Sequence, residues 1–352
     1  MTDAAQVTEP RRRSSWTGYA ALGWAAVYGG FGLVSALNGT AVFYRAAEPL
    51  PLGLNWTIVA LAVLAAMVAL ATVRPWGRRI PRQVVTVVLV GLCVLSGAAA
   101  FGLLMDLVSF GFNQTVDSWT STANRALAAV GVVLLIVTAR SYRSSADAAC
   151  QRCGAVHTSP TVRSRPEPTP APRSVRVLAY VGACAFLPYA AMKMTWALGG
   201  TFAGVSGEQM LAISVRNGAS GVWLTLARWG IDGTVLLAAL GVFLILGLVR
   251  PWGQVFPRWT LALRGRRVPR WLPLAPALIG AASLAPYGAV GVVYAALGTA
   301  GVVTVSRGDF LTSADALLVT WFGLGTFAVY GIALGAAAWS YLRRTQPICS
   351  VA

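Results

Sequence analysis

Two cysteines and a histidine in the middle of the chain have a spacing that could bind a metal ion. Cys150 and Cys153 form a Cys-x-x-Cys pair, and His157 is the only histidine in the sequence. Two thiolates from one tight turn can occupy two positions of a tetrahedral zinc site, and the imidazole would supply a third ligand. Cys349 or a partner chain would have to supply the fourth. The pattern predicts zinc or another soft metal, with redox switching or unligated thiols as alternatives.

A single lysine lies inside an apolar segment. Lys193 is the only lysine of the chain, Tyr189 lies one turn before it and Trp196 lies three residues after it. A charged group within a membrane span costs roughly 2.5–3.5 kcal/mol at its centre, so it is a candidate substrate, ion or coupling site. The alternative is a structural role. Because Lys193 lies near the outer end of the segment, its side chain could extend to the lipid headgroups or form an ion pair. Three acidic residues could be the counter-charge, namely Asp232, Glu208 and Asp315.

Five residues, Val-Arg-Pro-Trp-Gly, occur twice. They are residues 73–77 and 249–253. Proline ends a helix, glycine permits the turn, and arginine and tryptophan suit the membrane interface. We therefore interpret each element as a helix stop with interface anchors, and a binding role for the paired arginines is the alternative. The anchors are Arg74, Trp76, Arg250 and Trp252.

Several catalytic and cofactor-binding motifs are absent from the sequence, and their absence argues against the corresponding classes of enzyme. With one histidine in a loop, no pair of intramembrane imidazoles can hold haem and no His-containing catalytic triad can form within the membrane. The sequence has no Walker motif, no HExxH and no paired intramembrane carboxylates. We therefore expect no enzymatic activity.

Composition places the chain in the membrane. Of its 352 residues, 57% are apolar and 11% are charged, against roughly 45–50% and about 25% in soluble globular domains. The net charge of +17 is therefore not read as nucleic-acid binding. Because a helix needs roughly 20 mostly apolar residues to cross a bilayer, the sequence predicts an all-α integral membrane protein with eight spans. These are Trp16 to Leu37, Asn55 to Val73, Gln83 to Met105, Ala123 to Ala139, Val177 to Leu198, Thr234 to Val249, Leu272 to Leu297 and Ala314 to Tyr341.

Basic residues predict the orientation. With a cytoplasmic N-terminus, 22 of the 28 basic residues fall on the inner side of the eight predicted spans. Positively charged loops stay in the cytoplasm, so we expect a multi-pass plasma-membrane protein with both termini cytoplasmic. The basic inner face should attract anionic lipid headgroups.

Self-similarity divides the chain into two halves. Besides the repeated five residues, Tyr28 matches Tyr189, and Ser-Tyr closes both halves at Ser141 and Ser340. We predict a tandem, parallel 4+4 arrangement of two four-helix copies. The expected parts are a cytoplasmic tail at 1–15, a first copy at 16–140, a Pro- and Ser-rich cytoplasmic linker with the Cys-x-x-Cys pair at 141–176, a second copy at 177–344 and a cytoplasmic tail at 345–352.

The four-helix unit resembles uncharacterised actinobacterial polytopic membrane proteins of the domain-of-unknown-function type. The resemblance rests on the Arg-Pro-Trp-Gly inner turn and on the segment Trp196–Gly200, and it covers both halves. The first copy departs from it, with Ser35 and Asn38 where the second has Trp196 and Gly199. The resemblance implies a membrane location and no catalytic residue.

Two functions remain open. Parallel halves occur in transporters, which with Lys193 favours a small transporter-like or permease-like protein. The alternative is a non-catalytic scaffold or regulatory sensor that acts through its cytoplasmic Cys-x-x-Cys linker, where a partner protein could dock.

Overall fold

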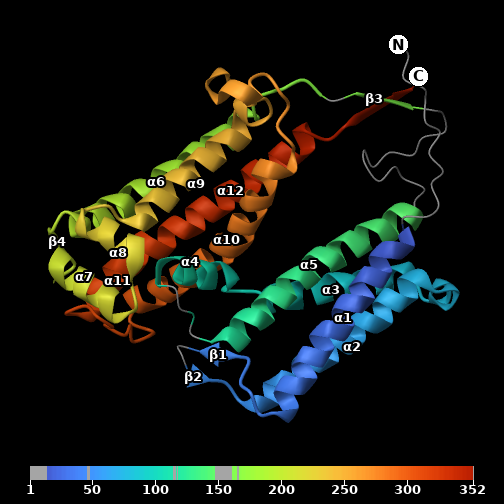
Figure 1. Ribbon diagram of the computed structural model, residues 1–352, viewed down its shortest axis with the longest axis horizontal. Helices are drawn as coiled ribbons and strands as arrows, with labels where there is room; N and C mark the ends of the chain where they lie inside the picture. Colours follow the sequence, from blue (N-terminus) through green and yellow to red (C-terminus); the bar gives the residue numbers. More distant parts are fainter. Residues whose placement is uncertain are drawn as a thin grey trace. The chain divides into compact units, whose positions relative to one another are not determined.

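The structure is a computed structural model that describes residues 14–45, 48–113, 116, 118–146, 161–164 and 166–351, and it is predominantly helical (Figure 1). The α-helices are α1 Ser14–Leu37, α2 Asn55–Val73, α3 Arg82–Ala99, α4 Leu103–Asn113, α5 Trp119–Ala146, α6 Arg173–Ala197, α7 Gly207–Arg216, α8 Gly221–Arg228, α9 Gly233–Val249, α10 Trp271–Thr299, α11 Ser313–Thr320 and α12 Thr326–Arg344. Short 3-10 turns are η1 Leu52–Leu54, η2 Pro75–Arg79, η3 Pro251–Gly253 and η4 Arg258–Leu263, and η5 Trp321–Gly325 is a π-helical turn.

The strands are short and form three pairs. Two pairs are local hairpins, and the third joins the linker between the two predicted copies to the C-terminal tail. β1 Tyr44–Arg45 pairs with β2 Glu48–Pro49, and β4 Thr201–Phe202 pairs with β5 Val205–Ser206. β3 Thr161–Ser164 pairs with β6 Ile348–Val351, which places Arg163 opposite Cys349. All three pairs are antiparallel.

Seven helical segments of the described chain are long and apolar enough to cross a membrane. An eighth span requires α8 and α9 to be counted together, because they are bent by 96° at a short break. The helix α9 alone has 17 residues. Each of the eight predicted spans falls in a helical segment, and the predicted bounds of α2, Asn55 and Val73, coincide with those of the structure.

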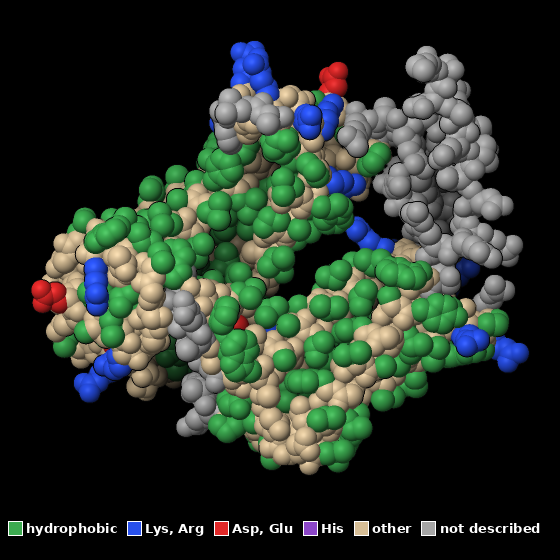
Figure 2. Space-filling view, viewed as in Figure 1, with side chains coloured by type: hydrophobic (Ala, Val, Ile, Leu, Met, Phe, Trp, Pro, Cys, Tyr) green, Lys and Arg blue, Asp and Glu red, His purple; other side chains and the backbone are tan. Residues whose placement is uncertain are grey.

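The long helices expose most of their apolar surface. Only 17% to 33% of the most apolar window in each of the seven spans is buried inside the protein. Figure 2 shows hydrophobic side chains along the lengths of the helices, while lysine and arginine side chains gather near their ends. Apolar surface of this extent is stable against lipid tails and not against water. The chain is therefore a multi-pass helical membrane protein.

The chain divides into two compact units. Unit 1 consists of Met1–Asp106, Val116–Ser164 and Pro347–Ala352, and unit 2 consists of Leu107–Thr115 and Arg165–Gln346. In unit 1, α1 packs against α2 and α5, and α3 also packs against α5 (Figure 1). The core of unit 1 includes Trp24 and Tyr28, whose rings stack with centroids 5.3 Å apart.

Unit 2 has α12 at its centre, in contact with α6, α9 and α10. Small residues allow this close packing. A Cβ atom on Gly331 would collide with the backbone of Ala285 in α10, and one on Gly288 would collide with the backbone of Ala328 in α12. The spacing of small residues in α12 therefore serves helix packing, as expected for membrane helices.

Two short helices between α6 and α9 do not belong to the eight predicted spans. The helix α7 begins with a capping box, in which the Ser206 hydroxyl accepts from the backbone N–H of Gln209 and the Gln209 side chain accepts from the N–H of Ser206.

The last predicted span, Ala314 to Tyr341, is divided into α11, the π-helical turn and α12.

Candidate functional site

The predicted metal ligands Cys150, Cys153 and His157 lie outside the described residues, so the zinc prediction stays a prediction. Cys349 lies in β6, where its backbone pairs with that of Arg163 in the linker strand β3. This pairing brings the C-terminal tail to the linker that carries the Cys-x-x-Cys pair. Within the described part of the chain, no group of three or more His, Cys, Asp or Glu side chains could hold a metal ion.

The two Arg-Pro-Trp-Gly elements have the same backbone structure. Arg74 and Arg250 are extended residues that end α2 and α9, and each donates its N–H to a carbonyl of the preceding turn. Gly77 lies directly against the carbonyl of Ala71, and Gly253 lies in the same way against that of Gly247. No residue with a Cβ atom would fit there. The helix-stop role is therefore visible in the backbone of both turns.

The side chains of the two turns differ. Trp76 is 48% exposed, whereas the Trp252 ring packs against Phe243 with centroids 4.8 Å apart. The guanidinium of Arg250 lies 5.6 Å from the ring centroid of Tyr180 in α6. Arg74 is exposed. The second turn is thus tied to its neighbouring helix by an arginine–aromatic contact.

Lys193 lies in the last two turns of α6 and is half-buried. Its Nζ atom is 6.0 Å from the ring centroid of Tyr189 and 5.8 Å from that of Trp196. Both distances allow a cation–π attraction. Among the described residues, no carboxylate oxygen lies within 4 Å of Nζ. The lysine therefore has aromatic neighbours and no protein counter-charge in this part of the chain.

The two aromatic side chains beside Lys193 are held in place. Trp196 is 5% exposed, and its indole N–H donates to the carbonyls of Val205 at 3.0 Å and Phe202 at 3.3 Å. Tyr189 is 8% exposed, and its ring lies 5.8 Å from that of Phe327 in α12. Because both rings are fixed by other contacts, the surroundings of Nζ are largely pre-organised.

The predicted counter-charges have other roles. Asp232 caps α9, since its carboxylate accepts from the backbone N–H groups of Thr234 and Val235 at 2.7 and 3.2 Å. A Cβ atom on Gly230 would lie 3.3 Å from the carbonyl of Ala197, so the chain just before Asp232 meets the end of α6 that carries Tyr189, Lys193 and Trp196. Two further acids were candidates: Asp315 receives a hydrogen bond from the Thr312 hydroxyl at the start of α11, and Glu208 is exposed in the first turn of α7.

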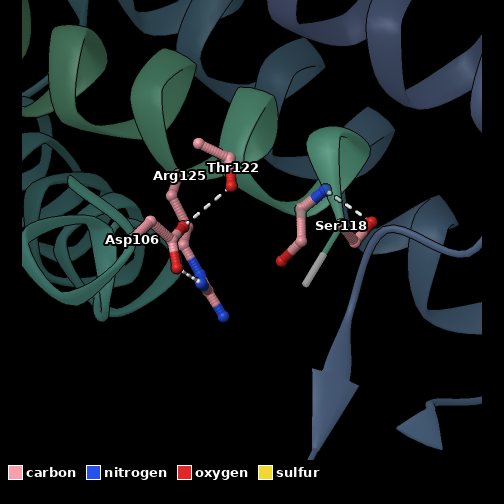
Figure 3. A network of polar contacts seen from close by, with 5 residues as sticks. Asp106, Ser118, Thr122 and Arg125 are labelled. Carbon is pink, nitrogen blue, oxygen red and sulfur yellow. Dashed lines mark hydrogen bonds and ion pairs between the residues drawn. The ribbon is translucent and has the colours of Figure 1, made fainter. Parts of the chain in front are cut away.

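Sequence reasoning missed an ion pair in unit 1. Asp106 in α4 pairs with Arg125 in α5 and also accepts from the Thr122 hydroxyl at 3.0 Å (Figure 3). The side chains of Asp106 and Arg125 are 12% and 25% exposed. Figure 3 shows the pair beside the start of α5, where the Ser118 hydroxyl accepts from a first-turn N–H. The sequence does place Asp106 at the end of one predicted span and Arg125 at the start of the next. These two opposite charges could have suggested the pair.

A second polar contact of unit 1 lies in its core. The Tyr28 hydroxyl donates to Oδ1 of Asn124 at 2.9 Å, and the indole N–H of Trp24 donates to the carbonyl of Leu127 at 2.8 Å. These bonds fasten α1 to α5. Tyr28 is the residue that the repeat aligns with Tyr189, but here its neighbour one turn on is Gly32 in place of Lys193.

The linker ends in a structured segment at the Arg-rich end of unit 2. The Gln254 side chain binds both backbone groups of Thr169, donating to its carbonyl at 2.7 Å and accepting from its N–H at 3.3 Å. Arg344 also donates to the Thr169 carbonyl, and donates to the carbonyl of Leu248 at 2.6 Å. The Ala171 N–H donates to the carbonyl of Val249 at the end of α9. The last residues of the predicted linker are therefore bound to α9, α12 and the turn that follows α9.

Comparisons with protein-family models, with curated proteins and with solved structures give no match for this chain.

Proposed function

We propose that this multi-pass membrane protein consists of two tandem four-helix copies, with both termini in the cytoplasm of a cell whose plasma membrane it spans. The order of elements supports the duplication: α1, α2, α3 and α5 in unit 1 correspond to α6, α9, α10 and α12 in unit 2. The shared turn after α2 and α9, with its glycine against a helix carbonyl, supports the same assignment. The resemblance to actinobacterial polytopic membrane proteins belongs to this proposal.

Within that architecture the protein is a small permease-like protein, and the end of α6 contains its anion-binding site. The observation that carries this function is Lys193, a cation that lies between two fixed aromatic rings and has no carboxylate within 4 Å in the described part of the chain. A small anion would supply the missing charge. The proline inside α6, Pro188, and the π-helical turn before α12 are features that membrane helices often have at functional positions.

The first experiment measures ligand binding by thermal unfolding of the detergent-purified protein. The probes are acetate, succinate, glutamate and inorganic phosphate. At least one anion should raise the midpoint of the wild type, and the same anion should enter proteoliposomes that contain the protein. Lys193→Met should lose both effects, while Lys193→Arg should keep the stabilisation.

Arg228→Met is the matched control, because it removes an exposed positive charge of α8 from the same unit. It should bind and transport like the wild type. Full binding and uptake by Lys193→Met, or no stabilisation of the wild type by any of the four anions, would remove the permease function.

A regulatory or scaffold role through the linker is the second candidate. It is favoured by the attachment of Thr169 to Gln254 and Arg344, which couples the linker to the turn after α9 and to α12. In this function zinc bound at the Cys-x-x-Cys pair, or a docked partner protein, would change the linker and thereby unit 2. The zinc content of the purified wild type and of Cys150→Ser tests this role.

A further inference from the structure

The Arg-rich end of unit 2 contains a cluster formed by α6 and the turn after α9. Arg250 of the turn places its guanidinium 5.6 Å from the ring centroid of Tyr180. Arg176 lies four residues before Tyr180, so the two share one face of α6. Arg173 lies one further turn towards the start of the helix. We call Arg176, Tyr180 and Arg250 the arginine–tyrosine cluster.

The cluster has no acidic partner in the part of the chain that the structure describes. No carboxylate oxygen lies within 4 Å of either guanidinium. The Nε atom of Arg176 is buried and has no hydrogen-bond acceptor among the described residues. A planar guanidinium held against an aromatic ring keeps its outward N–H groups available for an anion, and phosphate fits that geometry well. An anion with several acceptor oxygens would therefore suit both the charge and the donors of this cluster.

The surface next to the cluster is apolar and exposed. Val177 and Val181 of α6 are 52% and 50% exposed, and Cys184 continues the same stripe one turn further on. Such a stripe within a membrane span contacts lipid tails. In a bilayer that α6 spans, the cluster would therefore lie at the end of a lipid-facing surface, near the level of the phosphate headgroups. A free phosphate ion could bind the two arginines but would make no contact with the apolar stripe, whereas a phospholipid would contact both.

We propose that the arginine–tyrosine cluster binds the phosphate headgroup of one anionic phospholipid, whose acyl chains lie along Val177 and Val181. The phosphate accepts hydrogen bonds from Arg176 and Arg250 above the Tyr180 ring. This site does not depend on the permease function, because it lies at the opposite end of α6 from Lys193.

The first unit provides a matched comparison. The alignment that pairs Tyr28 with Tyr189 also pairs Tyr19 with Tyr180 and Ser15 with Arg176, and Arg74 takes the place of Arg250. Tyr19 is 48% exposed. In the described part of unit 1, no aromatic ring lies within cation–π distance of the Arg74 guanidinium. The copy with one arginine fewer therefore lacks the cluster.

The test measures the thermal midpoint of the full-length protein in detergent with added lipid. The probes are phosphatidylglycerol, phosphatidylcholine with the same acyl chains, and inorganic phosphate. Phosphatidylglycerol should raise the wild-type midpoint by several degrees, and the other two should not. Arg176→Gln combined with Arg250→Gln should lose most of that shift, whereas Arg74→Gln should keep it.

Two further variants keep the test valid if the double variant fails to fold. Tyr180→Phe should keep the lipid-dependent shift, because it keeps the ring, and Tyr180→Leu should reduce it. Equal shifts with phosphatidylcholine would overturn the charge specificity, and an equal shift with inorganic phosphate would identify a free-anion site in place of a lipid site. A full shift in the double variant or in Tyr180→Leu would place the lipid elsewhere.

Discussion

The hydroxyl of Tyr341 donates a 2.9 Å hydrogen bond to the carbonyl of Gly253, 88 residues earlier in the chain. This bond joins the end of α12 to the turn that ends α9. Tyr341 and Gly253 are both buried, so the carbonyl has little access to another donor. The repeated turn is therefore fastened from outside its own helix in unit 2.

We expect Tyr341→Phe to destabilise the protein by about 1–2 kcal/mol, because a buried carbonyl loses its donor. The change removes one oxygen atom and little packing. Thermal unfolding in detergent measures the loss. Tyr142→Phe at the matching position of unit 1 is the control and should cost less, since Tyr142 is only half-buried. Equal effects of the two changes would contradict the prediction.

Alanine should not be tolerated at the glycine of either turn. In Gly77→Ala and Gly253→Ala the new methyl group would overlap a helix carbonyl, so the turn must move. The yield of monodisperse protein from size-exclusion chromatography should fall sharply for both. Gly91→Ala is the matched control, because nothing lies within 4 Å of its Cβ position and alanine favours a helix. Normal yields for Gly253→Ala would show that the close approach is not required.

Removing one partner of the ion pair in unit 1 should be more harmful than removing both. Asp106→Asn leaves Arg125 largely buried without its counter-charge, and we expect a loss of about 1–3 kcal/mol, discounted for the partial exposure of the pair. The double variant with Arg125→Gln should recover part of it. Unfolding of the two single variants and the double variant gives the coupling energy. Additive losses would show that the two charges do not interact.

Zinc is the prediction attached to the linker. Purified wild-type protein should contain close to one zinc per chain by elemental analysis, and Cys150→Ser should contain much less. Cys349→Ser tests the fourth ligand and should weaken binding without abolishing it. Cys184→Ser is the control, because this thiol lies within a span and should not affect metal content. A wild type and a Cys150→Ser variant that both lack metal would remove the sensor hypothesis.

The spans could be predicted from the sequence because each depends on the average hydropathy of about 20 consecutive residues. The details of caps and side-chain contacts hardly change that average. The bounds of α2 follow from Asn55, which opens the apolar run, and from Pro75, which ends it. The helices α7 and α8 were missed because they have 10 and 8 residues, too few for a span, and they depend on caps such as Ser206.

The surroundings of Lys193 were predicted in part. The spacing from Tyr189 to Trp196 placed both rings beside the lysine, since neighbours on one helix follow from the helical repeat. Its relation to Asp232 could not be predicted in the same way. That carboxylate is used in capping α9, and only the three-dimensional arrangement of the chain end shows which donors it binds. The Asp106–Arg125 pair was missed for the same reason, because it depends on how α4 meets α5.

The attachment at Thr169 shortens the part of the linker that can absorb strain. Both backbone groups of this residue are bound before α6 begins at Arg173. A protein that pulled on the preceding chain would therefore load the turn after α9 through Gln254 and the last turn of α12 through Arg344, as well as the start of α6. Tension on the linker would therefore act on the end of α12 and on the turn after α9. These are the two segments that the hydrogen bond from Tyr341 to Gly253 joins.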